Sequence, residues 1–307
     1  MITNVNPQAA LFLANLNRVQ ENLATANNQV SSGLRITVAS DAPDQISTLL
    51  QLRANLQHNT QVQSNLTLAQ TDAQTADDAL SSSIQLIDSA TSLATQAATA
   101  TTDAAGRASL AQQVVSIQQQ MVANSQTTVQ GRYIFSGDQD SAPQYTWDPT
   151  AADPVVAGQA SGSTRLIENP AGGTFAASQT AQQIFDDQDP TTSSPATDNV
   201  FNALNTLQQA LQNNDTAGIT NSLSLLQAAS DHLNSAQAFY GNVEENIQSC
   251  NTYASQNAVQ LQTQISDVQD ADVTTAAMEL TQDTTQLQAA FETQGKMPHD
   301  SLFNYLG

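Results

Sequence analysis

The stretch ITNSLSLLQAASDHLNSAQAFYGNVEENIQSCNTYASQNAVQLQTQISDV, residues 219–268, decides the fold because an apolar residue recurs at every seventh position without interruption. The recurring residues are Ile219, Leu226, Leu233, Tyr240, Ile247, Ala254, Leu261 and Val268. A companion series three residues on contains Ala229, Ala236, Val243 and Cys250. Such heptads are typical of a helix that packs lengthwise against others. We therefore expect a helix over 216–270, about 80 Å long, with Cys250 in the core.

Residues 44–100 carry a similar pattern and are predicted to form the main partner helix. The two series are Leu52, Asn59, Leu66, Ala73, Leu80, Ile87, Ala94 and Asn55, Val62, Ala69, Ala76, Ser83, Ala90, Ala97. Shorter apolar patterns predict further helices near 107–129 and 199–212.

The proline distribution separates these helical regions from a middle segment. Six of the nine prolines lie between 143 and 195, whereas 44–142 and 196–297 contain none. Proline interrupts helices, and the middle segment also holds Trp147 and the pair Gly172-Gly173. The expected fold is mainly α: an elongated coiled-coil or helical-bundle rod built from the N- and C-terminal halves, with a small β-rich subdomain inserted at 139–197.

The two ends of the chain carry shorter and less regular heptads. In residues 8–32 the series Leu16, Leu23, Val30 has a companion series that contains Leu13 and Leu34, but Gln20 and Asn27 interrupt this companion series. In residues 272–294 the series Val273, Leu280, Leu287 is accompanied by Ala277 and Phe291, and Thr284 interrupts it. Helices of this length are marginal alone. We therefore expect both ends to be loose in the monomer and to become ordered on assembly, where they lie side by side and cover each other.

The connector between the first two predicted helices has specific turn chemistry. Gly33 suits the left-handed position that ends a helix. In Asp41-Ala42-Pro43-Asp44, we expect Asp41 to cap the following helix and Pro43 to occupy its first turn.

The charge balance excludes several classes of partner. The chain has 28 acidic and 7 basic residues, a net charge of -21. Nucleic acid and anionic membrane surfaces would repel it. No apolar run is long enough to span a bilayer. The N-terminus lacks the basic start of a cleaved secretory signal, so composition alone indicates a cytoplasmic protein.

Short motifs at both ends resemble the flagellin family. The N-terminal motif is Ser31-Ser32-Gly33-Leu34-Arg35-Ile36 followed by Ala39-Ser40-Asp41-Ala42-Pro43. The C-terminal motif runs from Asp270-Ala271-Asp272-Val273 through Leu287-Gln288-Ala289-Ala290-Phe291 to Ser301-Leu302-Phe303-Asn304-Tyr305-Leu306. Within the family, Gly131-Arg132-Tyr133-Ile134-Phe135-Ser136-Gly137 and the segment 200–215 are similar to the members that join hook to filament.

The resemblance implies a structural role and a five-part chain. The parts are 1–42, an inner-core helix and connector; 43–138, half of the helical rod; 139–197, the β-rich outer subdomain; 198–270, the other half of the rod; and 271–307, the second inner-core helix. The residues implied in assembly are Leu13, Leu16, Leu23, Val30, Leu34, Arg35, Val273, Ala277, Leu280, Leu287, Phe291, Leu302 and Leu306.

The resemblance also implies a location and partners. The chain would be exported through the flagellar type III apparatus without signal cleavage and would reside in the extracellular flagellum, which overrides the cytoplasmic interpretation. Its partners would be further copies of itself, a hook-side junction protein, flagellin, and an export chaperone with the export apparatus.

Two alternatives remain open at the level of sequence. Filament flagellin is one, because Ile2, Ala42 and Asn242-Val243 stand where the hook-joining members usually have arginine, a second acid and arginine. A cytoplasmic coiled-coil signalling or scaffold protein is the other, although it would lack the proline-rich insert.

No pattern of catalytic or metal-binding residues is present in the sequence. His58, His232 and His299 are scattered, without a nucleophile motif or metal spacing, and are expected to be solvated. The pairs in Asp138-x-Asp140 and Asp186-Asp187-x-Asp189 lack a complete calcium loop and are expected to serve turns and caps. We therefore expect no enzymatic activity and no cofactor.

Overall fold

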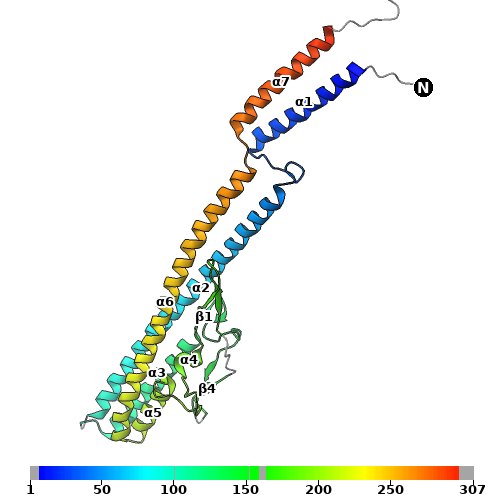
Figure 1. Ribbon diagram of the computed structural model, residues 1–307. Coiled ribbons are helices and arrows are strands. Elements are labelled where there is room, and N and C mark those ends of the chain that lie inside the picture. The colour runs from blue at the N-terminus through cyan, green and yellow to red at the C-terminus, as the bar shows by residue number, and fades with distance from the viewer. Residues whose placement is uncertain (1–6, 100, 152, 159–163, 297–307) are drawn as a thin grey trace, which may run out of the picture. The chain divides into compact units, whose positions relative to one another are not determined.

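The computed structural model describes residues 7–99, 101–151, 153–158 and 164–296 and is mainly α-helical (Figure 1). The helices are α1 (Pro7–Ser32), α2 (Ile46–Ala98), α3 (Ala104–Ser125), α4 (Ala181–Phe185), α5 (Val200–Gln212), α6 (Thr216–Gln269) and α7 (Val273–Lys296). Between α3 and α5 lie short antiparallel strands. The predicted mainly α fold with a β-containing insert is confirmed.

The chain falls into two compact units, and both long helices contribute to each. Unit 1 contains residues 1–58 and 257–307, and unit 2 contains residues 59–256. The insert belongs to unit 2 together with the helices it contacts. The finer division into five parts remains a prediction.

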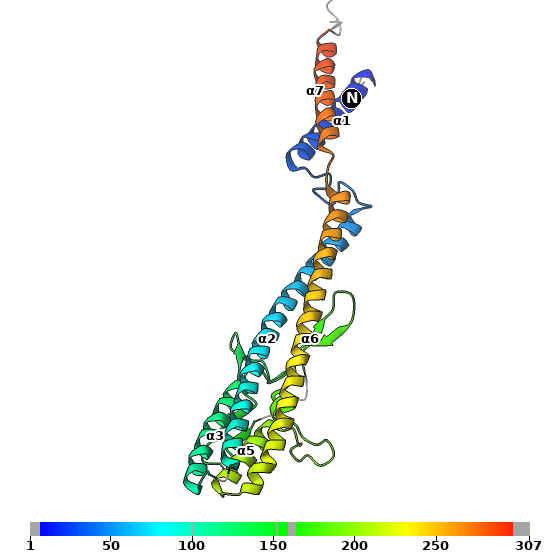
Figure 2. The same cartoon turned by 90° about the vertical axis from the view of Figure 1, so that its left-hand side faces the viewer.

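Unit 2 is a bundle in which α2 and α6 lie side by side, with α3 and α5 packed on each other beside them (Figures 1 and 2). From Asn59 to Ala97, every predicted heptad position of α2 is buried. The predicted positions of α6 from Ile219 to Ala254 are buried as well, and so is Cys250. Asn59 is accommodated in this core because its amide donates to the carbonyl of Ala254, at 2.8 Å. The long-helix heptads are therefore confirmed over these ranges, whereas before them Leu52 is only half-buried and the predicted position Asn55 is exposed.

A buried arginine closes one end of the bundle. The Arg107 guanidinium donates to the carbonyl of Ala97 in the last turn of α2, at 3.0 Å. It also donates to the side chain of Asn214, at 2.6 Å, in the short turn between α5 and α6. A cation is favourable there because the last carbonyls of a helix have no partner within the helix. Arg107 thus links three helix ends.

The insert consists of separate hairpins rather than one sheet. β1 (Thr128–Val129) pairs with β2 (Arg132–Tyr133), β3 (Tyr145–Trp147) with β4 (Val155–Ala157), and β5 (Leu166–Glu168) with β6 (Thr174–Ala176). All three pairs are antiparallel. The first hairpin lies before residue 139, where the insert was predicted to start. Its strands are joined by Gln130 and Gly131, whose φ values of 52° and 78° are typical of the two-residue turns in short hairpins.

Aromatic packing fixes the insert on the bundle. Phe135 follows β2, is fully buried, and meets Phe185 of α4 and Tyr240 of α6 edge-on, with ring centroids 5.9 and 6.3 Å apart. The carbonyl of Phe135 accepts from the N–H of Ala181 at the start of α4, at 2.7 Å. Burial raises the pKa of the Tyr240 phenol, whose oxygen accepts from the N–H of Gln179. The motif 131–137 therefore anchors the insert.

Four charged side chains make a second attachment between the insert and α2. Arg165 donates to Asp72 of α2 at 2.9 Å and to Asp140 at 2.6 Å. Arg132 lies 3.4 and 3.6 Å from the same two carboxylates. All four side chains are partly shielded from solvent, so these ion pairs are screened less than surface pairs. The network neutralises charge where the hairpins meet the helix.

Candidate assembly interface

In unit 1, the helices from the two chain ends pack on each other. α1 and α7 lie side by side and run in opposite directions, since Leu34 after α1 pairs with Asp270 before α7 (Figure 1). On α1 the shielded positions are Phe12, Leu16, Val19, Leu23, Ala26 and Val30. On α7 they are Ala276, Leu280, Asp283, Leu287 and Ala290. These alternating spacings of three and four residues define a heptad seam, which we call the terminal seam.

The terminal seam corrects part of the sequence interpretation. Of the predicted series, Leu16, Leu23, Val30, Leu280 and Leu287 face the seam, but Val273 is exposed. The predicted companions within the two helices do not face the seam. Leu13, Gln20 and Asn27 are exposed, as are Ala277, Thr284 and Phe291. The true companions lie one residue earlier, at positions 12, 19 and 26 and at 276, 283 and 290. On α7 the prediction failed because Asp283, an acid, occupies a buried seam position. On α1 it failed because Leu13 and Val19 are equally spaced from Leu16.

The connector and the start of α7 are joined through backbone hydrogen bonds. Gly33 ends α1 with φ of 71°, as predicted, and its carbonyl accepts from the N–H of Ala271. The carbonyl of Gln269 accepts from the N–H of Arg35, at 2.7 Å. The Arg35 guanidinium donates to the carbonyl of Val268, at 2.6 Å, and to the side chain of Gln45, at 2.7 Å. The C-terminus of α1 and the N-terminus of α7 are thus held together at one end of the terminal seam.

Asp41 does not cap α2, and this prediction was wrong. α2 begins at Ile46, and the Asp41 carboxylate instead accepts from the N–H groups of Val38 and Thr37 and from the Thr37 hydroxyl. These bonds, that from Val38 first, hold the pKa of the Asp41 carboxyl below its usual value. Asp41 binds backward along the chain, and not to α2, because the loop before it offers three donors within hydrogen-bonding distance.

Asp272 performs the capping role at the start of α7. Its carboxylate accepts from the Thr275 hydroxyl and from the N–H groups of Thr275 and Thr274. The Thr275 hydroxyl bond is the main cause of a lowered pKa for the Asp272 carboxyl, followed by the two N–H bonds. A negative side chain is favoured here because it satisfies helix N–H groups that lack partners within the helix.

The residues predicted for assembly divide into two groups in the described chain. Leu16, Leu23, Val30, Leu34, Leu280 and Leu287 are half-buried. Leu13, Arg35, Val273, Ala277 and Phe291 are exposed. Leu302 and Leu306 lie outside the described residues. Assembly through these side chains stays a prediction, with the exposed group available to another molecule and the half-buried group engaged within the chain.

Large apolar side chains are exposed on both terminal helices. Leu13 is 55% exposed and Phe291 is 52% exposed. Leu11 and Met278, which sequence reasoning missed, are 66% and 61% exposed. We call these four residues the open apolar group. Exposed apolar side chains on a pair of helices are candidates for contact with another molecule.

The polar candidates outside unit 1 were predicted only in part. Asp189 serves a turn, accepting from the N–H groups of Thr191 and Thr192, as expected. His232 is not a solvated helix-face histidine: its ring lies 3.1 Å from Asp198 and 2.8 Å from the carbonyl of Gln183. His58 is exposed, and His299 lies outside the described residues. No described helix combines the length and apolarity needed to cross a membrane.

Comparison of the sequence with protein families identifies both ends of the chain. The bacterial flagellin N-terminal helical region matches residues 3–140, and the bacterial flagellin C-terminal helical region matches residues 223–306. Together the two regions cover more than two thirds of the sequence, so the chain belongs to the flagellin family. No curated protein matches the sequence.

Solved structures with the same fold carry flagellar names. A Vibrio parahaemolyticus protein assigned as a flagellar hook-associated protein matches with a TM-score of 0.63 and 19% identity, over 75% of this chain and 100% of its own. FlgL of Xanthomonas campestris matches with a TM-score of 0.57 and 16% identity, over 70% and 99%. The flagellar junction protein FlgL of Legionella pneumophila gives 0.54 and 10%, over 73% and 99%. At these identities the likeness establishes the fold.

Proposed function

We propose that this chain is a structural subunit of the bacterial flagellum that joins the hook to the filament. The observation that carries the proposal is the terminal seam of α1 and α7, which leaves the open apolar group uncovered in a chain of the flagellin family. When a second molecule covers a surface of this kind, apolar side chains are removed from water and the free energy of the system falls. The proposed role is therefore structural rather than enzymatic.

Three observations favour the hook-joining role over filament formation. The motif 131–137 resembles the hook-joining members of the family, and it anchors the insert on the bundle through Phe135. The segment 200–215, which includes α5, resembles the same members. The solved relatives reported above are named as hook-associated or junction proteins.

The proposed partners follow from this position in the assembly. Contacts between unlike surfaces of identical subunits generate a ring or an open helical array. One side of such an array would meet a hook-side junction protein and the other would meet flagellin. Before assembly the chain would bind an export chaperone and pass through the type III apparatus to the extracellular flagellum, without cleavage of a signal.

Polymerisation of the purified full chain, alone and with short filament seeds or isolated hooks, separates the two flagellar roles. Binding to hook ends without elongation supports the junction role. Long filaments grown from the chain alone would instead assign it as filament flagellin, and absence of any assembly would contradict both.

A pair of matched substitutions tests which surface assembles. Leu13→Ala removes an exposed leucine of the open apolar group, and Leu166→Ala removes a leucine of β5 that is 63% exposed. We expect Leu13→Ala to weaken binding to hooks and Leu166→Ala to leave it unchanged. Because both side chains are exposed, neither change should unfold the chain. Equal effects of the two substitutions would refute the assignment of the interface to the terminal helices.

A further inference from the structure

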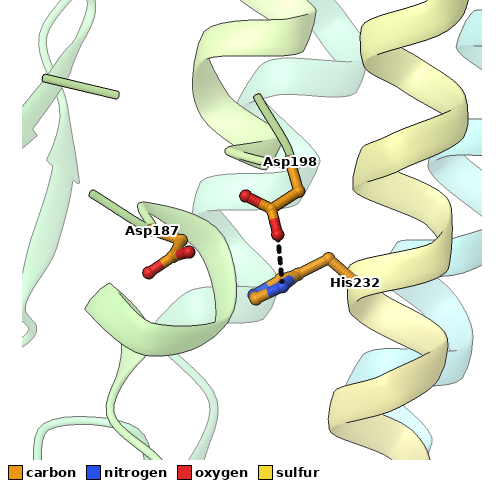
Figure 3. Close-up of side chains that lie close together, drawn as sticks. All are labelled: Asp187, Asp198 and His232. Carbon is orange, nitrogen blue, oxygen red and sulfur yellow. Dashed lines mark ion pairs between the residues drawn. The ribbon is translucent and has the colours of Figure 1, made fainter. Parts of the chain in front are cut away.

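Three side chains from separate segments of unit 2 meet beside α6. Asp187 follows α4, Asp198 precedes α5, and His232 lies on α6 (Figure 3). One potential ligand atom from each lies within 4.8 Å of the others, and all three residues are half-buried. The set offers two carboxylate oxygens and one imidazole nitrogen, which are common ligands of divalent metal ions.

The hydrogen bond of His232 decides which ring nitrogen faces the carboxylates. Nε2 lies 2.8 Å from the carbonyl oxygen of Gln183 in α4. A carbonyl can only accept, so Nε2 carries the hydrogen in this bond. In the neutral ring, Nδ1 is then an acceptor with its lone pair available. Nδ1 lies 3.1 Å from Oδ2 of Asp198, so two acceptors face each other across a hydrogen-bonding distance (Figure 3).

Two facing acceptors at this distance share either a proton or a metal cation between them. A single proton on Nδ1 would satisfy the contact with Asp198 but would leave the Asp187 charge uncompensated. Among the described residues, no hydrogen bond or ion pair involves the Asp187 carboxylate, whereas the neighbouring Asp186 accepts from Tyr145 and Asn199, each at 2.8 Å. A divalent cation bound by all three groups would balance both carboxylates.

The surrounding hydrogen bonds hold the three groups in position. The Asn199 side chain donates to the backbone carbonyl of Asp187, at 2.9 Å, and its own oxygen caps the start of α5. The N–H of Ala196 donates to the same carbonyl. The bond from His232 Nε2 to a backbone carbonyl is the usual outer partner of a metal-binding histidine, since it fixes the ring and the tautomer.

We infer that Asp187, Asp198 and Nδ1 of His232 bind a divalent transition-metal ion of the zinc class. Zinc bonds of about 2.0–2.1 Å in a tetrahedron place two ligands about 3.3 Å apart, close to the 3.1 Å between Nδ1 and Oδ2. A small movement of the Asp187 side chain would complete three protein ligands, leaving the fourth position for water. The ion would join the loop after α4, the start of α5, and α6.

Calorimetric titration of the metal-free full chain with ZnCl2, after removal of any affinity tag, tests the site. We expect one ion per chain, with a Kd that rises at least about tenfold in Asp198→Asn and Asp187→Asn and binding lost in His232→Gln. Asp189→Asn and His58→Gln are the matched controls, because neither side chain belongs to the cluster, and both should bind as the wild type does. Circular dichroism checks that each variant is folded.

Imidazole ¹⁵N chemical shifts give an independent test that names the atom. Zinc should move the Nδ1 resonance of His232 strongly and its Nε2 resonance little, while the other two histidines stay unchanged. The thermal midpoint of the wild type should also rise with zinc, because a ligand that binds only the folded state stabilises it, and His232→Gln should lose this rise. Absence of zinc binding by the wild type, or wild-type binding by folded His232→Gln, would overturn the inference.

Discussion

Replacing Asp283 with leucine should stabilise the pairing of α1 and α7. Asp283 occupies a buried position of the terminal seam, with 9% exposure, so a leucine there would be almost fully covered. Burying a leucine side chain contributes about 1.5–3 kcal/mol. Local opening of α7 from α1 should therefore become rarer by roughly 10 to 100-fold.

Native-state hydrogen exchange of the α7 amides measures this opening directly, and Thr284→Leu is the matched control. Thr284 is exposed, so leucine at that position should change the opening free energy by about 0.5 kcal/mol or less. Protection in Thr284→Leu equal to or above that in Asp283→Leu would show that the seam follows the series 277, 284 and 291 instead. Faster exchange in Asp283→Leu would refute the reasoning in a second way.

Three further predictions concern the packing of the insert and the start of α7. Phe135→Ala should lower the free energy of unfolding of unit 2 by about 3–5 kcal/mol, as buried aromatic truncations do; urea unfolding followed through Trp147 fluorescence checks this, and a loss below about 1 kcal/mol would contradict the anchoring role. Arg165→Met should cost about 1.5–3 kcal/mol by the same assay, because Asp72 and Asp140 each lose a charged hydrogen bond. The lowered pKa of the Asp272 carboxyl means that its capping bonds stabilise α7 above about pH 4 and that this contribution is lost as pH falls through the folded-state pKa. Exchange of the α7 amides should accelerate over that range in the wild type but much less in Asp272→Asn.

The helices of unit 2 could be predicted from sequence because their buried positions are almost all apolar. Leu66, Leu80 and Ile87 of α2 and Leu226 and Leu233 of α6 recur at sevens, and the structure buries every one of them. The proline-rich segment likewise marked the insert. Regular spacing carries this information because a long helix must turn one continuous face to its partner.

The terminal seam could be predicted only in part, for a local reason. Leu13 and Val19 are both apolar and both lie three residues from Leu16, so spacing alone permits either companion series. On α7 the acid at 283 made the correct series look broken. The side of a short helix that is buried depends on where its partner lies, and a single sequence does not contain that information.

The cluster around His232 could not be predicted from spacing at all. Asp187, Asp198 and His232 are separated by 11 and 34 residues, and they meet because α4, α5 and α6 converge in the folded chain. The same holds for Arg165, whose partners Asp72 and Asp140 come from α2 and from the loop after β2. Long-range polar contacts of this kind require the three-dimensional arrangement.

Cys250 equips the chain with a chemical reporter of its own opening. It is the only cysteine, it lies in the core shared by α2 and α6, and burial raises the pKa of its thiol. A thiol reagent can therefore react at an appreciable rate only when these two helices separate. The rate of thiol modification would therefore measure how often α2 and α6 separate around Cys250. The measurement needs no added label, and it can be made on the free subunit and on the subunit within a larger structure.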